Sequence, residues 1–288
     1  MTVIPDGKAS PARTEESLTI SETSRDVSHS TRRARSGQAL NMTAAPLLNG
    51  CNVMLPLDMA KRLFDALNVY HDIASRSAAL NMAIDEALLE TAEIPTIRFY
   101  TWDHPALSFG YFGKFADLEN HAPPRDLTRR WTGGGIVFHG DDLTYSIVIP
   151  ATELAFSESS RSIYERIHNA LRDALVSEGR DAVVAAVADC GSGVSDADYN
   201  GHCFANPVRA DVLSNGRKIA GAAQRRTRRG LLQQGSIQGI QLANKFADQF
   251  ANELCSECYH KTLDEHLIAR AHEIAERKYG AASWLQRR

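Results

Sequence analysis

The chain has 288 residues, which is enough for one large or two modest domains. Its 43 % hydrophobic and 23 % charged residues are ordinary for a soluble globular protein, and a net charge of −3 argues against general binding to nucleic acid or to a membrane surface. No apolar run approaches the roughly 20 residues that span a bilayer. Five cysteines, an odd number, do not suggest a disulfide scaffold, so we expect a cytoplasmic protein.

Residues 1–48 are rich in Ser, Thr and Arg and have little apolar periodicity, which predicts a disordered N-terminal extension. A charged region followed by an apolar core is absent, so we expect no secretory signal, and acidic residues such as Asp6 and Glu15 argue against a transit peptide. We expect the folded domain to span residues 55–250, followed by a C-terminal helical segment at 251–288.

Two helices are predicted at the start of the folded domain. Residues 57–70 place apolar side chains on one face of a short amphipathic helix. Residues 77–92 form a better helical pattern, with Asp85 and Glu86 expected on its solvent side.

The remaining elements follow from periodicity and turn residues. In chain order they are strands at 97–102 and 106–112, a loop or short helix at 117–126, a helix at 160–178, strands at 182–187, 211–213, 218–224 and 231–241, and two helices in the last 40 or so residues. Asn215-Gly216 is a strong hairpin turn, and residues 189–201 predict a flexible loop. A regular βαβ alternation is absent, so the predicted class is α+β, with a mixed or antiparallel sheet and packed helices.

The segment RRWTGGGIVFHGDDLTYSIVIP, residues 129–150, contains three consecutive glycines, Gly133, Gly134 and Gly135. Glycines permit positive φ and a close approach of a ligand to the backbone, and Arg129 and Arg130 before them could neutralise an anion.

The strand-forming segments 136–139 and 143–149, joined by a turn at 140–142, predict a hairpin after this loop. A loop that enters a hairpin is unlike a Walker P-loop, which opens a helix. From these residues alone, the glycines could be plain turn formers or a ligand cradle.

Cys203 follows the glycine-containing loop and precedes the strand that carries Lys218. A nearby ammonium would favour the reactive thiolate and could polarise a substrate carbonyl. A small, half-buried filler is the alternative for a single cysteine.

Two further groups of residues leave their roles open. Cys255 and Cys258 form one C-x-x-C within a helical pattern; a zinc site needs a second ligand pair, which His260 alone does not supply. The arginine run at 225–229 predicts a solvated turn or, alternatively, a docking site for an acidic protein.

Six segments, in order and in register, resemble the biotin/lipoate protein ligase and transferase superfamily. They are NMAIDEALL (81–89), IRFYTWDHPALSFGYF (97–112), RRWTGGGIVFH (129–139), DLTYSIVIP (142–150), GRKIAGAAQRR (216–226) and LLQQGSI (231–237). The resemblance implies a mixed-sheet α+β catalytic domain in which a glycine-rich loop and a lysine bracket an acyl-chain tunnel. The residues that it implies for acyl or substrate binding are Arg130, Gly133, Gly134, Gly135, His139 and Gly221, and it places Lys218 at the catalytic centre.

Three features separate the chemistries of this superfamily. CFANP at 203–207 looks like the segment that carries the nucleophile of cysteine-dependent octanoyltransferases, and DDLTYS at 141–146 is similar to a segment of the same group. Fewer than 50 residues follow the core, too few for the adenylate-covering domain typical of lipoate ligases. Gly113, where many relatives have glutamine, and Val208-Arg209, which replaces Ser-x-Tyr, depart from the group's pattern.

The resemblance therefore implies an octanoyltransferase in which Cys203 accepts octanoate from octanoyl-acyl carrier protein. It implies transfer to the lysine of a lipoyl-domain protein or of glycine cleavage H protein, with no cofactor and no metal. The alternatives are an ATP- and Mg-dependent lipoate–protein ligase, an amidotransferase between two lipoyl-bearing proteins, and a non-catalytic protein that only holds an acyl group or a partner.

Overall fold

The computed structural model describes residues 62–118, 125–186 and 207–287, which all belong to the unit Val53–Arg288. The disordered extension predicted at 1–48 and the loop predicted at 189–201 lie outside the described residues, as does Cys203. The predicted division of the folded part at residue 250 remains a prediction.

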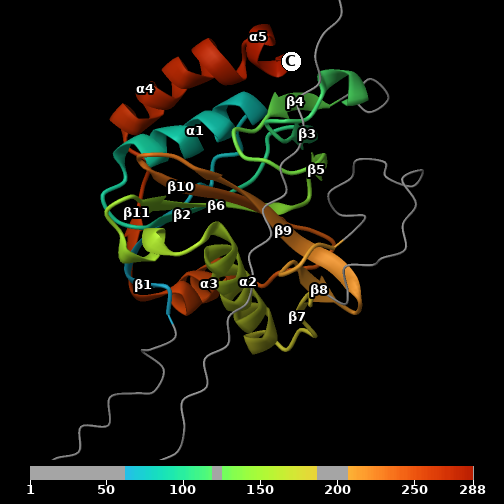
Figure 1. Ribbon diagram of the computed structural model, residues 1–288, viewed down its shortest axis with the longest axis vertical. Coiled ribbons are helices and arrows are strands. Elements are labelled where there is room, and N and C mark those ends of the chain that lie inside the picture. The colour runs from blue at the N-terminus through green and yellow to red at the C-terminus, as the bar shows by residue number, and fades with distance from the viewer. Residues whose placement is uncertain (1–61, 119–124, 187–206, 288) are drawn as a thin grey trace, which may run out of the picture. The chain divides into compact units, whose positions relative to one another are not determined.

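Eight strands form the main sheet, in the order β11-β1-β2-β6-β10-β9-β8-β7 (Figure 1). β1 pairs in parallel with β2 and β11, and the other neighbours are antiparallel. This mixed sheet confirms the predicted α+β class. The strands are β1 Phe64–His71, β2 Thr96–Tyr100, β6 Leu143–Pro150, β7 Val183–Val184, β8 Val212–Ser214, β9 Arg217–Arg226, β10 Gly230–Ile237 and β11 Cys255–Lys261.

A second sheet of three strands has the order β4-β3-β5 and consists of β3 Ala106–Phe109, β4 Asp126–Arg129 and β5 Val137–His139. The hairpin predicted across residues 140–142 is wrong, because its two strands belong to different sheets. β5 pairs with β3, whereas β6 lies between β2 and β10. The turn thus carries the chain from the small sheet to the main one.

Helices cover both faces of the main sheet (Figure 1). On one face, α1 Ala78–Thr91 packs against α4 Glu265–Ile274 and the π-helical turn Ala275–Tyr279 that follows it. On the other, α2 Ser160–Ser177 and α3 Phe246–Leu254 cover the larger apolar core. The remaining short helices are the 3-10 turns Phe115–Leu118 and Leu154–Ser157 and the C-terminal α5 Ala282–Leu285.

Local signals explain the elements that were predicted well. Ser77 and Ser159 cap α1 and α2 by accepting backbone N–H bonds, at the start of the two confirmed helices. The β8–β9 hairpin is also confirmed, because Asn215 and Gly216 both adopt positive φ, 48° and 73°.

Three predictions fail where distant parts of the chain decide the structure. The helix predicted at 57–70 is strand β1 over its described part, and the helical pattern around Cys255 is strand β11. These two strands pair in parallel although the paired residues, such as Phe64 and Cys255, lie 191 positions apart, so no local signal marks them. Asp85, expected on the solvent side of α1, is fully buried because its carboxylate accepts bonds from Arg98 and other donors.

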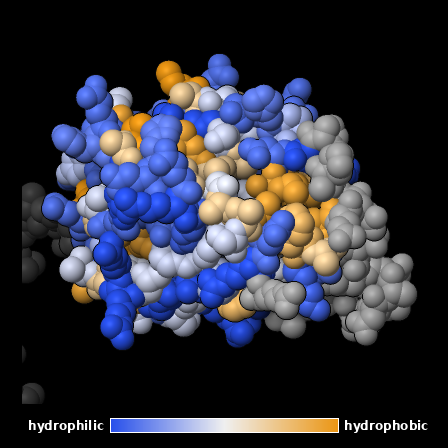
Figure 2. Space-filling model, turned by 90° about the horizontal axis from the view of Figure 1, so that it is seen from above, coloured by the Kyte–Doolittle hydropathy of each residue, from blue (hydrophilic) through white to orange (hydrophobic). Residues whose placement is uncertain are grey.

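The side of the molecule on which α4 and α5 lie is mostly hydrophilic, with hydrophobic side chains gathered in a smaller area (Figure 2). Within the described ranges, none of the helices combines the length and the apolar character needed to cross a membrane.

Candidate functional site

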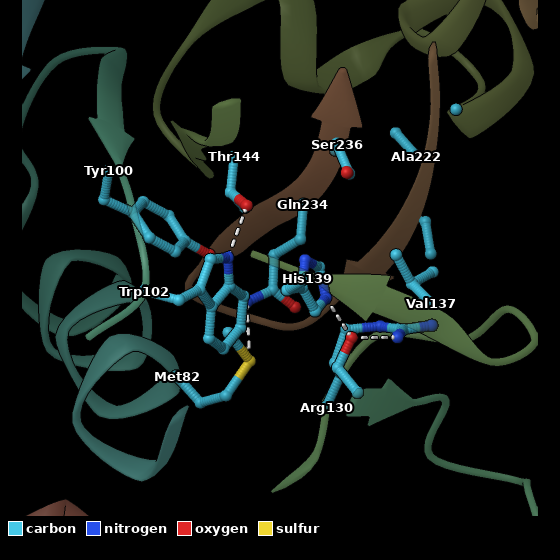
Figure 3. Close-up of a pocket in the computed structure, with 14 residues that line it drawn as sticks. Met82, Tyr100, Trp102, Arg130, Val137, His139, Thr144, Ala222, Gln234 and Ser236 are labelled. Carbon is cyan, nitrogen blue, oxygen red and sulfur yellow. Dashed lines mark hydrogen bonds between the residues drawn. The ribbon is translucent and has the colours of Figure 1, made fainter. Parts of the chain in front are cut away.

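A cavity lies between the main sheet, the small sheet and α1 (Figure 3). It encloses about 430 Å³ not filled by protein atoms, including its open mouth, and the centre of a water-sized sphere can reach about 30 Å³ of it. Its lining consists of Met82, Tyr100, Trp102, Ser108, Arg130, Val137, His139, Thr144, Gly221, Ala222, Ala223, Gln234, Gly235 and Ser236. Small residues from β9 and β10 keep one wall open, and aromatic and polar side chains form the other.

His139 lies at the centre of a buried hydrogen-bond chain in the cavity wall. Its Nδ1 is 2.8 Å from Asp142 Oδ2 and its Nε2 is 2.6 Å from Ser108 Oγ. Burial lowers the pKa of His139 against the opposing effect of Asp142. The neutral ring therefore donates a hydrogen bond from Nδ1 to the carboxylate and accepts a hydrogen bond from the Ser108 hydroxyl at Nε2.

Several donors converge on the Asp142 carboxylate. Oδ2 also accepts from Thr144 Oγ1 at 2.8 Å and Ser236 Oγ at 2.7 Å, and Oδ1 accepts from Gly140 N at 3.0 Å. Burial alone would raise the pKa of this carboxyl, but the hydrogen bonds from His139 and Ser236 lower it. Asp142 thus stays ionised and holds the imidazole of His139 in one orientation.

Arg130 connects this chain to the glycine loop. Its Nη1 donates to Ser108 Oγ at 2.6 Å, and its Nη2 donates to the carbonyls of Gly133 at 3.0 Å and Gly135 at 2.9 Å. The guanidinium is buried and therefore fixes the loop against the small sheet. Gly134 has a φ of 86°, so the loop needs glycine there.

Arg129 has a different role from its neighbour. Its buried guanidinium donates to five backbone carbonyls: those of Tyr111, Gly113, Trp284, Leu285 and Arg287. Arg129 therefore holds the C-terminal residues against the loop after β3, and the expectation that it neutralises a bound anion is not supported.

Lys218 and Asp211 form a second buried group beside the cavity. Nζ of Lys218 lies 2.7 Å from Asp211 Oδ2, and both side chains are almost fully buried. Asp211 also accepts from Tyr164 Oη at 2.6 Å and from Val208 N at 2.7 Å. Burial, reinforced by Asp211, raises the pKa of Tyr164, so the phenol remains a donor.

Gly221 brings the Lys218 ammonium close to the cavity wall. A Cβ atom at this position would lie 2.6 Å from Cε and 2.8 Å from Nζ of Lys218. A Cβ atom here would therefore push the end of the lysine side chain aside, and glycine leaves room for Lys218 to lie against this part of the lining.

The predicted site residues thus occupy three kinds of position. Arg130, His139 and Gly221 line the cavity, and the acyl- or substrate-binding role that the resemblance implies for them stays a prediction. Gly133 and Gly135 contact Arg130, and Lys218 contacts the back of Gly221. Cys203 lies outside the described residues, so its distance from Lys218 is not defined.

Ser108, Asp142 and Ser236 complete the polar wall but were not among the predicted site residues. Ser108 and Ser236 look like ordinary strand residues, and only the sheet pairing shows their direction. Asp142 follows His139 by three residues in a turn, and this spacing between a histidine and a carboxylate was an available signal.

The other sequence features have structural partners. Arg225 lies over the rings of Tyr111 and Trp131, and Arg226 donates to the carbonyls of Phe156 and Glu158. At least these two members of the arginine run are held by the fold. Cys255 and Cys258 are free thiols with sulfur atoms 2.9 Å apart.

The fold is similar to that of solved lipoate–protein ligases. Lipoate-protein ligase A bound with ATP superposes with a TM-score of 0.58 at 19 % identity, covering 77 % of this chain and 98 % of that one. The bipartite lipoate protein ligase of Thermoplasma acidophilum gives 0.52 at 19 % identity, with 77 % and 96 % covered. At these identities the likeness shows the fold alone.

Residues 77–250 match the family model of the lipoyl protein ligase A/B catalytic domain, and the chain belongs to this family. Among its curated relatives are the octanoyltransferases LipM of Oceanobacillus iheyensis, 39 % identical over 56 % of this chain, and of Kyrpidia tusciae, 36 % identical over 67 %. The match covers 60 % of the first relative and 74 % of the second, so the chain spans roughly three fifths to three quarters of their length.

Proposed function

We propose that this protein is an octanoyltransferase that moves an octanoyl group from acyl carrier protein to the lysine of a lipoyl domain or of glycine cleavage H protein. The observation that carries the proposal is the cavity, with a buried Lys218–Asp211 pair directly behind Gly221 in its wall. The identity of 35–39 % to octanoyltransferases LipM supports this reaction over others of the family.

An acyl chain suits the mixed lining of the cavity. Met82, Val137 and Ala223 offer apolar contacts to a hydrocarbon chain, and each buried CH₂ group contributes about 0.8 kcal/mol. The hydrogen-bond network of Asp142, His139, Ser108 and Arg130 keeps the opposite wall rigid, because each polar group in it has a partner within the protein. A rigid wall lets the length of the cavity select the length of the acyl chain.

The proposed nucleophile is the thiolate of Cys203. It attacks the carbonyl carbon of the carrier thioester, and collapse of the tetrahedral adduct expels the carrier thiolate and leaves an octanoyl-cysteine thioester. The target lysine amine then attacks this thioester, expels the Cys203 thiolate and loses a proton, giving an amide. Neither step requires a nucleotide or a metal, because the acyl group passes from one thioester to another and then to an amide.

Lys218 is proposed to stabilise the oxyanion that forms in both steps. Asp211 and Tyr164 fix the position of its side chain, so little reorganisation is needed during the reaction. Chain length limits the reach of Cys203: it precedes Val208 by five residues, an extended span of at most about 18 Å, and Val208 N donates to Asp211. This limit is compatible with the contact between the thiol and Lys218 that the proposed mechanism requires.

The test compares two acyl donors with a lipoyl domain as acceptor. With octanoyl-acyl carrier protein and no nucleotide, the wild-type protein should add one octanoyl group to the lipoyl domain, as measured by the mass of the acceptor, and Cys203→Ser should not. Modification that occurs only with free octanoate, ATP and Mg²⁺, and that survives Cys203→Ser, would overturn the proposal in favour of a lipoate–protein ligase.

A further inference from the structure

Three metal-ligating side chains meet at the edge of the main sheet where β1 and β11 pair. His71 ends β1, His260 belongs to β11, and Asp248 lies in the first turn of α3, which packs against both strands (Figure 1). None of the three lines the cavity. The cluster is therefore separate from the proposed acyl-transfer site.

The strand register explains why the two histidines converge. In the parallel pairing of β1 with β11, Val69 lies opposite His260. His71 is two residues further along β1, so its side chain is on the same face as that of Val69, and His260 is its diagonal neighbour. The buried side chain of Val69 packs in the core beneath α3, which places Asp248 above this face.

The ligand atoms are already close to one another. One nitrogen of each histidine and one Asp248 oxygen all lie within 4.8 Å of each other, and His71 Nε2 is 2.8 Å from Asp248 Oδ1. The two imidazole rings are stacked with centroids 5.5 Å apart and an interplanar angle of 10°. His71 also stacks on Phe99 at 5.7 Å, so its ring is held between two others.

We propose that His71, Asp248 and His260 form a binding site for a transition-metal dication such as Zn²⁺, with one coordination position left for water. Two imidazole nitrogens with one carboxylate suit zinc better than Mg²⁺ or Ca²⁺, which prefer oxygen ligands. Zinc bonds of about 2.0–2.2 Å place ligand atoms no more than about 4 Å apart. Metal binding would require the exposed His260 ring to rotate out of its stack on His71 to close the remaining gap.

Bound metal would join three segments that are far apart in the sequence. β11 is the edge strand of the main sheet, and the contact between His71 and Asp248 already spans 177 residues. Because the ligands come together only in the folded chain, the metal should stabilise the folded state.

The experiment titrates the full-length, tag-free protein with Zn²⁺ alone. Isothermal titration calorimetry measures the affinity and the stoichiometry, and thermal unfolding measures Tm with and without the metal. We expect one equivalent to bind and to raise Tm. In His260→Gln and in Asp248→Asn the affinity should fall at least about 100-fold, since even outer-shell partners cost 10–100-fold, and the Tm increase should vanish. Circular dichroism without metal should show that both variants remain folded.

Two control variants test whether the cluster itself is responsible. His104 and Asp103 form an exposed pair 3.1 Å apart and are not part of the three-ligand cluster, so His104→Gln should bind zinc as the wild type does. Cys258→Ser should also bind normally. Failure of the wild type to bind, unchanged affinity in His260→Gln, or loss of binding in Cys258→Ser would each overturn the proposal, the last in favour of the Cys255–Cys258 pair.

Discussion

Two buried groups, each formed by a cation and its carboxylate partners, lie on opposite faces of the main sheet. They differ in the side chains that surround them. On the α1 face, Arg98 contacts Asp72 and Asp85, and its guanidinium also bonds to Asn81. On the α2 face, Lys218 contacts Asp211. The planar guanidinium divides its donors between fixed partners, whereas the lysine presents a compact charge at the end of a flexible chain.

The residues that contact the two groups indicate different roles for them. Asp85 accepts hydrogen bonds from Tyr100 and Gln234, so the Arg98 group supports the cavity wall from behind. The ammonium of Lys218 lies against Gly221, where a side chain would displace it. A buried ion pair therefore stabilises the fold at Arg98 and, as we propose, takes part in the reaction at Lys218.

Arg98→Met tests the structural half of this comparison. The variant leaves Asp85 buried without its cation, while Asp72 keeps Arg76 as a partner, and breaking a buried pair in this way costs about 3–5 kcal/mol. Urea unfolding should show this loss in the free energy of unfolding. The matched control is Arg172→Met, whose partly exposed pair with Asp173 should contribute no more than about 1 kcal/mol. Equal effects in the two variants would contradict a structural role for Arg98.

Lys218→Met tests the reactive half. Loss of an oxyanion donor lowers kcat by about 10²–10³-fold, which transfer assays at saturating donor would measure. The variant also leaves Asp211 unpaired, so stability should fall as well.

The double variant Lys218→Met/Asp211→Asn separates the two effects. Removal of the unpaired charge should restore much of the free energy of unfolding while kcat stays low. If activity returns together with stability, Lys218 acts only through the fold.

His168 gives a smaller effect that depends on pH. It is buried beneath the Lys218 group, with Nδ1 donating to the Ala210 carbonyl and Nε2 accepting from Tyr145, and burial lowers its pKa to about 4. The unfolded chain, with a usual pKa near 6.5, binds the proton first, so stability is lost as pH falls from about 6.5 towards 4.

Between pH 7 and pH 5 this one group should account for about 2 kcal/mol of lost stability. Urea unfolding of the wild type and of His168→Gln at both pH values would measure it. The pH dependence of the variant should be weaker by that amount, and parallel curves for the two proteins would refute the assignment to His168.

The sequence was sufficient where local signals determine structure. Apolar residues at helical spacing placed α1 and α2, and Asn215-Gly216 placed the β8–β9 hairpin. Resemblance to a known family named Arg130, His139 and Gly221, which line the cavity, and their binding roles stay predictions.

Non-local pairing and buried charge were beyond local reasoning. Strand β11, CSECYHK, is polar and exposed along most of its length, and only its parallel pairing with β1 makes it a strand. Asp85 was expected to be exposed to solvent, because helical spacing shows on which face of a helix a residue lies but not which side chains contact it. Its main cation, Arg98, lies on a strand. The role of Ser108 likewise depends on its opposing neighbours, Arg130 and His139.

The most direct test of the central claim is the mass of the protein itself after brief mixing with octanoyl-acyl carrier protein in the absence of an acceptor. We predict the gain of one octanoyl group, located on Cys203 by peptide mass analysis, absent in Cys203→Ser and lost when a lipoyl domain is added. A wild-type protein that modifies the lipoyl domain but never carries the acyl group on Cys203 would contradict the account.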